Sequence, residues 1–225
     1  MFEFKIDKLI RTHRKTIGLQ ITSDARLIVR APYSASEDFI YKLISRKGAW
    51  IRSKQDHFKE RQKKAVLRRF IPGEEFLFLG QPYILVVIED LPKAVVLDSV
   101  LMVSSAVLGN ARDHLENWYK ARASEHINQR VEHYARTHGL EYRSVRINEA
   151  RTRWGSCGHT NKLNFTWRLV MAPPRVVDYV VIHELMHTIE KNHSRRFWDQ
   201  VARLMPDYKQ EELWLKMNGY LLSWV

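Results

Sequence analysis

The sequence predicts an α+β fold in two parts, a β-rich N-terminal part over residues 1–108 and a helix-and-sheet part over residues 109–225. Two observations predict this division. Short apolar runs separated by Gly, Pro and Asp alternate with period 2 as far as Val103, which is typical of strands. After Gly109-Asn110 the apolar residues recur with a period of 3.6, which is typical of amphipathic helices, so we place the boundary there.

In the first part we expect an antiparallel sheet made by strands over residues 2–7, 15–21 and 25–31. Ser36 then opens a helix, because acidic residues follow in its first turn, where the helix dipole favours them. The inward residues of that helix are expected to be Phe39, Ile40, Leu43 and Ile44. Beyond the break at Pro72-Gly73, four more short strands are predicted, over residues 76–79, 83–88, 94–97 and 100–103.

In the second part a long helix is predicted over residues 111–137, ending at His138-Gly139. Strands follow over residues 142–148 and 163–170. Pro173-Pro174 begins the next helix, because proline is tolerated in a first helical turn. Two further helices are expected, over residues 194–201 and 211–217.

The composition favours a cytoplasmic protein with a real hydrophobic core. Of the 225 residues 45% are hydrophobic, and Cys157 is the single cysteine, so no intramolecular disulfide can form. The N-terminal residues do not resemble a signal peptide, and no stretch reaches the roughly 20 apolar residues that cross a bilayer. We therefore expect no membrane partner. No particular oligomeric state is predicted.

The chain is strongly basic, with a net charge of +12 and a pI near 9.9. The excess peaks over residues 46–69, where ten Lys and Arg residues face only Asp56 and Glu60. With Trp50, Ile51 and Phe58 at helical spacing, this segment predicts a basic amphipathic helix. Two interpretations stay open: a docking face for nucleic acid or a nucleotide, and a solvated helix face, which is the commoner case.

The strongest functional signal is His183-Glu184-Leu185-Met186-His187, an H-E-x-x-H motif. On a helix, residues four apart lie about 6 Å from each other on one face, so the two imidazoles can bind one metal ion. Zinc suits such nitrogen ligands, although another divalent metal is an alternative. Glu184 can then act as general base toward a water molecule that the metal acidifies. The ordinary alternative is a pair of partly buried histidines beside a surface acid.

His193 is the favoured third ligand. It follows His187 by six residues, so it can reach the metal only if the helix stops, and Lys191-Asn192 is a plausible stop. Glu190 competes, but it lies nearly two turns from His183, and we expect it to support a ligand instead.

Other candidate residues have weaker support. Arg153, Arg168 and Tyr208 are candidates for stabilising transition-state charge or contacting substrate, although a surface arginine or a core tyrosine is the more ordinary interpretation. Cys157 is either a soft metal ligand or a small buried residue, and Asp199 is a candidate for orienting His193. In the second part, the strand residues 163–168 are either a substrate-pairing edge or an ordinary core strand.

Several runs together resemble one family. They are Arg151-x-Arg153-Trp154-Gly155-Ser156-Cys157, the stretch Tyr179 to His187, and Asn192-His193-Ser194 with Phe197-Trp198. The combination resembles the YgjP-like metallopeptidase-domain family, which is related to the SprT and WLM zincin-like proteases. The resemblance covers most of the chain, more loosely in its N-terminal half. Met186 stands where Cys is common in such motifs, which we interpret as an apolar exchange.

The resemblance implies a C-terminal zincin-like domain with His183, His187 and His193 on zinc and Glu184 as general base. It implies a metal-dependent hydrolase that acts on peptide or protein substrates. Some relatives are instead described as nucleoside triphosphate pyrophosphatases acting on UTP, and the metal chemistry permits either reaction. From a different class, a nucleic-acid-associated module with a structural zinc would need a fourth protein ligand, for which Cys157 is the candidate.

Overall fold

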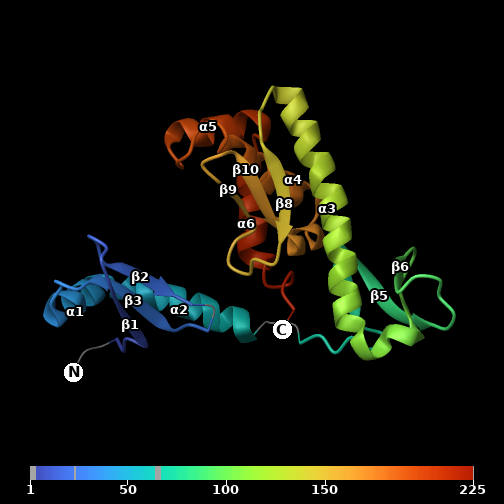
Figure 1. The fold of residues 1–225 in the computed structure, drawn as a ribbon, viewed down its shortest axis with the longest axis horizontal. Coiled ribbons are helices and arrows are strands. Elements are labelled where there is room, and N and C mark those ends of the chain that lie inside the picture. Colours follow the sequence, from blue (N-terminus) through green and yellow to red (C-terminus); the bar gives the residue numbers. More distant parts are fainter. Residues whose placement is uncertain (1–3, 23, 64–66, 225) are drawn as a thin grey trace. The chain divides into compact units, whose positions relative to one another are not determined.

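The computed structural model describes residues 4–22, 24–63 and 67–224, and the chain forms two compact units, residues 1–65 and 66–225. Both units combine helices with sheet, so the fold is α+β as predicted (Figure 1). The division differs from the predicted boundary at 108/109. Phe76, Leu85 and Leu101 belong to the same core as the long helix that follows, because their strands bury their apolar faces against it.

The first unit contains a three-stranded sheet of β1 (Lys8–Thr12), β2 (Gly18–Ile21) and β3 (Leu27–Pro32), in the order β1-β3-β2. The sheet is mixed and not antiparallel as predicted, because β1 runs parallel to β3. The strand predicted over residues 2–7 is wrong for its described part, since pairing starts at Lys8. Residues 1–3 lie outside the described residues.

Helices α1 (Glu37–Arg46) and α2 (Gly48–Lys63) cover one face of this sheet. The Ser36 side chain caps α1 by accepting a hydrogen bond from the Phe39 backbone N–H at 3.3 Å. Ile40 and Ile44 are buried as predicted. The prediction for Phe39 is wrong: this residue is 58% exposed, because its position, one before Ile40, lies outside the buried face of the helix. The basic helix predicted over residues 46–69 forms in part, as α2, in which Ile51 is fully buried. It is shorter than predicted, because residues 67–69 are not helical, and residues 64–66 lie outside the described residues.

The second unit begins with a four-stranded sheet in the order β4-β5-β7-β6, close to the predicted strands. Its members are β4 (Glu75–Phe78), β5 (Gln81–Ile88), β6 (Val95–Leu97) and β7 (Leu101–Ser104). After a 3-10 turn, η1 (Ser105–Asn110), the helix α3 (Ala111–His138) runs the length of the unit and ends before Gly139 at φ 63°, as predicted (Figure 1). The Tyr119 hydroxyl donates to the Leu77 carbonyl at 2.7 Å, which ties α3 to β4.

A second three-stranded sheet lies between α3 and the C-terminal helices (Figure 1). It contains β8 (Ser144–Asn148), β9 (Gly155–Cys157) and β10 (Lys162–Thr166), in the order β8-β10-β9. The strand predicted over residues 163–170 is too long, because Trp167–Met171 forms a 3-10 turn, η2. β10 is the central strand, with partners on both edges, so of the two interpretations of residues 163–168 the core strand holds and the substrate-pairing edge does not.

Three helices complete the unit: α4 (Pro174–Met186), α5 (Arg195–Leu204) and α6 (Tyr208–Asn218). Nine residues of α4 are buried, because it packs on the sheet and on α3. The Arg130 guanidinium on α3 makes two bonds with the Asp178 carboxylate on α4, at 2.5 and 2.9 Å. Across the described helices, no segment has the length and apolar character that crossing a bilayer requires.

Candidate metal centre

The three histidines predicted as metal ligands converge on one point. His183 lies in the last turn of α4, His187 is its C-cap residue, and His193 precedes α5. The Nε2 atom of His193 lies 3.0 Å from Nε2 of His183 and 3.1 Å from Nε2 of His187. The three candidate ligand atoms lie within 4.8 Å of one another. Zinc–nitrogen bonds of about 2.0 to 2.1 Å place tetrahedral ligand atoms roughly 3.4 Å apart, so three such atoms suit one ion.

The chain returns to this point because α4 ends earlier than predicted. The helix stops at Met186, not at Lys191-Asn192, and a turn follows in which the Glu190 N–H donates to the Met186 carbonyl at 2.9 Å. On the far side, Ser194 caps α5 by accepting a hydrogen bond from the Phe197 N–H at 3.3 Å. These two anchors bracket the segment that carries His193.

The ring nitrogens of His187 have distinct roles. Its Nδ1 lies 3.0 Å from the Glu190 carbonyl oxygen, an acceptor, so Nδ1 carries the proton and the Nε2 lone pair faces the other rings. Glu190 thus contacts His187 through its backbone carbonyl. The buried Nδ1 of His183 has no hydrogen-bond partner among the described protein groups.

An aromatic wall backs the histidines. The buried Phe197 ring lies 4.4 to 4.9 Å from the centroids of His183, His187 and His193. The Trp198 ring stacks on His193 at 5.6 Å. Burial lowers the pKa of His183 to about 3, with the neighbouring histidines adding to the effect, and also lowers the pKa of His187. Both rings are therefore neutral at physiological pH, the form in which imidazole binds a metal.

Glu184 is buried next to His183, and the Oε2 atom of its carboxylate has no hydrogen-bond partner within the described structure. Burial raises the pKa of Glu184 to about 8, and the positive charge of Arg153 opposes this shift. Its side chain lies against Gly155 on β9. A Cβ atom at position 155 would come within 2.6 Å of the Glu184 Cγ and 2.7 Å of Oε1, so this close approach requires glycine.

A fourth protein ligand is not present among the described residues, since the group of ligand atoms contains only the three histidines. Cys157 stays outside it. Its half-buried Sγ lies 3.9 Å from Lys191 Nζ, and burial raises the pKa of its thiol. The residues present fit a divalent metal with an open position, because three imidazole nitrogens converge and the rings of His183 and His187 are neutral.

The model of the YgjP-like family, metallopeptidase domain, matches residues 15–218. The chain belongs to this family. No curated protein matches the sequence at a significant level. Among solved structures, the chain is similar to the metallopeptidase zymogen abylysin of Pyrococcus abyssi, with 19% identity and a TM-score of 0.38. That match covers 44% of this chain and 98% of the other. The YgjP-like metallopeptidase family implies a divalent metal ion and a peptide substrate.

Of Arg153, Arg168 and Tyr208 in this YgjP-like chain, Arg153 is the residue whose charge affects the pKa of Glu184. Arg168 lies elsewhere: its guanidinium stacks over Trp167 at 4.4 Å and donates to the Glu149 carbonyl. Tyr208 is one ring removed from the ligands, since it stacks on Trp198 at 5.2 Å and on Tyr179 at 6.2 Å.

Asp199 does not contact His193. Its carboxylate pairs with Arg195 at 4.0 Å on the exposed side of α5. Lys191, which the sequence indicates only as part of a plausible helix stop, makes the contacts instead. Its Nζ donates to the Asn161 side chain at 2.5 Å and to the Gly158 carbonyl at 3.4 Å, which joins the ligand segment to the β9–β10 turn.

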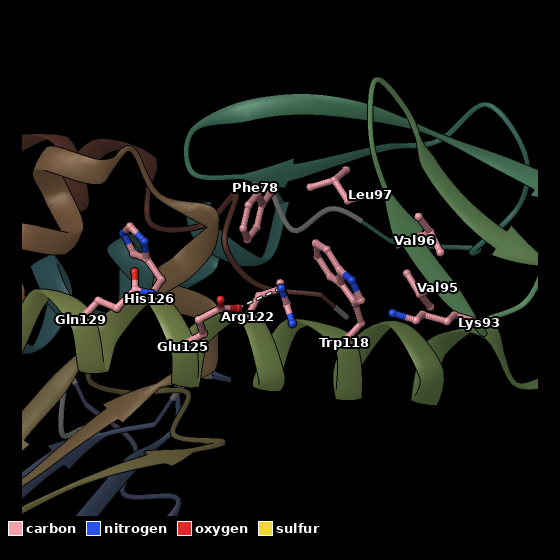
Figure 2. A pocket seen from close by; sticks show the side chains of 10 residues that line it. All are labelled: Phe78, Lys93, Val95, Val96, Leu97, Trp118, Arg122, Glu125, His126 and Gln129. Atoms are coloured by element: carbon pink, nitrogen blue, oxygen red, sulfur yellow. Dashed lines mark ion pairs between the residues drawn. The ribbon is translucent and has the colours of Figure 1, made fainter.

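A pocket of about 480 Å³ lies elsewhere in this unit, between α3 and the edge strand β6. Figure 2 shows Trp118 on α3 next to Phe78 and Val95, with Arg122 and His126 farther along the same helix. None of the three converging histidines lines it. The pocket is therefore separate from the candidate metal centre.

Proposed function

We propose that the protein is a zinc-dependent peptidase in which His183, His187 and His193 hold the ion and Glu184 is the general base. The convergence of three Nε2 atoms beside the buried Glu184, whose Oε2 has no hydrogen-bond partner among the described residues, carries this proposal. The family assignment independently supports a metal-dependent peptidase.

A bound zinc ion would supply a Lewis acid that polarises the scissile carbonyl and acidifies a water molecule. Glu184 takes the proton of the attacking water on a carboxylate oxygen and later passes it to the leaving amine. A buried carboxylate with a raised pKa suits this role, because its proton affinity lies near the working pH. The wall of Phe197 and Trp198 excludes water from the back of the histidines.

We infer that the substrate binds as an extended peptide along β9. Among the described strands β9 pairs only with β10, so no strand covers its other edge, and its Gly155 contacts the Glu184 side chain. Backbone hydrogen bonds to such an edge would hold a peptide by strand addition next to the proposed base. Arg153, exposed and two residues before Gly155, is the candidate for contacting the substrate or the developing negative charge.

The two alternatives receive less support. A structural zinc would be closed by a fourth ligand, and Cys157 does not join the described group. A nucleotide pyrophosphatase acting on UTP would need cations to hold a triphosphate. Of the cations that interact with residues of this site, Lys191 is bonded within the protein and Arg153 is exposed.

The test compares the zinc-loaded wild type with Glu184→Gln, on a mixed peptide library and on the four ribonucleoside triphosphates. We expect one zinc per chain in both proteins and peptide cleavage in the wild type alone. Cleavage by the variant at the wild-type rate would refute Glu184 as the base. Pyrophosphate release from UTP, lost in the variant, would replace the peptidase assignment.

A further inference from the structure

The positive charge is concentrated in the first unit. Residues 1–65 contain 16 Lys and Arg against 7 Asp and Glu, which is +9 of the total +12. The second unit, with more than twice the residues, carries only +3. This imbalance points to a polyanionic partner for the first unit.

One face of the sheet in this unit is uncovered by its helices. Leu27, Val29 and Ala31 on β3 are fully buried against α1 and α2, so the alternate residues point to the opposite face. The strand registers place Ile10 and Gly18 beside Arg30, and Lys8 and Gln20 beside Ile28. The outer face, as we define it, consists of Lys8, Ile10, Thr12, Gly18, Gln20, Ile28, Arg30 and Pro32.

Three cations gather on the outer face. Lys8 and Arg30 point outward from β1 and β3. The Arg14 guanidinium lies over Gly18, where a Cβ atom would come within 2.6 Å of its Nη1, so glycine makes room for this third cation. None of the three forms an ion pair with a carboxylate of the described residues.

The acids near this face are already engaged. Asp7 accepts a hydrogen bond from the Leu27 backbone N–H at 2.7 Å. Asp24 forms an ion pair with Arg26. The outward positions of the three strands contain no Asp or Glu. The outer face therefore carries a net positive charge.

Apolar and aromatic groups accompany the cations. Ile10 and Ile28 are partly exposed and pack in neither hydrophobic core. Immediately after β1 and β3, the rings of His13 and Tyr33 lie 5.1 Å apart, and Tyr33 is 64% exposed. Tyr33 follows the last residue of β3, so it lies at the end of the sheet and beyond the outer face as defined. An exposed ring at the end of a basic sheet can stack an unpaired base while the cations bind the phosphates.

We propose that the outer face binds single-stranded nucleic acid, with Lys8, Arg14 and Arg30 on phosphates and Tyr33 stacking a base. The single strand is favoured over a duplex because its bases are free to stack on Tyr33. This activity does not involve the histidines and is independent of the proposed peptidase function.

The test measures fluorescence anisotropy of a labelled single-stranded RNA with full-length protein over a series of salt concentrations. In the variant Lys8→Gln/Arg14→Gln/Arg30→Gln, the slope of log K against log salt should fall by about 2, because each phosphate contact contributes roughly 0.7. The matched control, Lys47→Gln/Lys54→Gln/Lys59→Gln, removes the same charge from the helical side and should retain the wild-type slope. Tyr33→Ala should weaken binding roughly tenfold.

Equal decreases of the salt slope in the two triple variants would overturn the proposal. They would indicate that the RNA is attracted to positive charge on any side of the unit. Absence of binding at low salt, tighter binding of a duplex, or an unchanged affinity in Tyr33→Ala would also overturn it. Binding that persists with a metal chelator, and in Glu184→Gln, is expected. Circular dichroism of each variant checks that the fold is retained.

Discussion

The side chain of Glu184 lies against the backbone of Gly155, at the point where α4 meets the outer strand of the sheet. The residue that we propose as general base is thus positioned by the strand that we propose as the substrate edge. A displacement of either one moves the other, which makes position 155 a sensitive site for substitution.

Gly155→Ala should lower kcat about 100-fold while leaving zinc affinity within error. The added Cβ atom would lie too close to the Glu184 side chain, so the carboxylate would have to move away from its position beside the histidines. Steady-state peptide hydrolysis and a zinc titration measure the two quantities. Gly158→Ala is the matched control, since a Cβ atom there would meet only the Lys162 carbonyl at 3.7 Å, an ordinary contact. Equal rates for the two variants would contradict the role of Gly155.

Lys191→Met should weaken zinc binding roughly tenfold or more, because it releases the ligand segment from the β9–β10 turn. Competition with a chromophoric chelator measures the affinity. Lys209→Met removes the same charge from an exposed position on α6 and should bind zinc as the wild type does. An unchanged affinity in the Lys191 variant would mean that the turn does not position His193.

Ser194→Ala should also lower zinc affinity, since loss of the N-cap frees the start of α5 next to His193. The lost cap itself costs about 1 kcal/mol of folding free energy. Ser36→Ala removes a cap of the same length, 3.3 Å, from α1 and provides the comparison. Zinc titrations of the two proteins should differ, and a similar affinity in both would show that the cap acts on stability alone.

Stability should fall as the pH drops through about 6.5, in part through His126. Burial lowers the pKa of His126 below its ordinary value of 6.5, and the buried Nε2 has no partner among the described groups. The unfolded chain therefore binds this proton more readily, so protonation favours unfolding. Comparing Tm at about pH 8 and about pH 6 should show a smaller loss in His126→Gln than in the wild type. His183 and His187 contribute equally to both proteins, and an identical loss in both would refute the effect of His126.

Much of the site is readable from local sequence. The spacing of His183 and His187 on an apolar helix, and a third histidine before a Ser194 cap, are local features governed by backbone geometry within a few residues. The same holds for α3, whose inward residues from Leu115 to Val131 repeat with the helical period. Both helices formed where they were predicted, although α4 ended earlier.

Other features depend on which distant segments pair. The order β8-β10-β9 leaves β9 and not β10 at the edge, and the parallel pairing of β1 with β3 makes the first sheet mixed. The boundary lies near residue 65 because Phe76 and Leu101 are buried in the same core as α3. The change in the spacing of apolar residues at Gly109 carries no information about this packing.

The sequence by itself determined which residues can bind a metal and which segments become helices, because spacing along a helix follows from its fixed rise and turn. Only the tertiary structure decided which strand edge stays open, that Gly155 contacts Glu184, and that Lys191 anchors the ligand segment. These contacts join residues about 30 positions apart, and their partners are selected by packing and strand pairing across the whole unit.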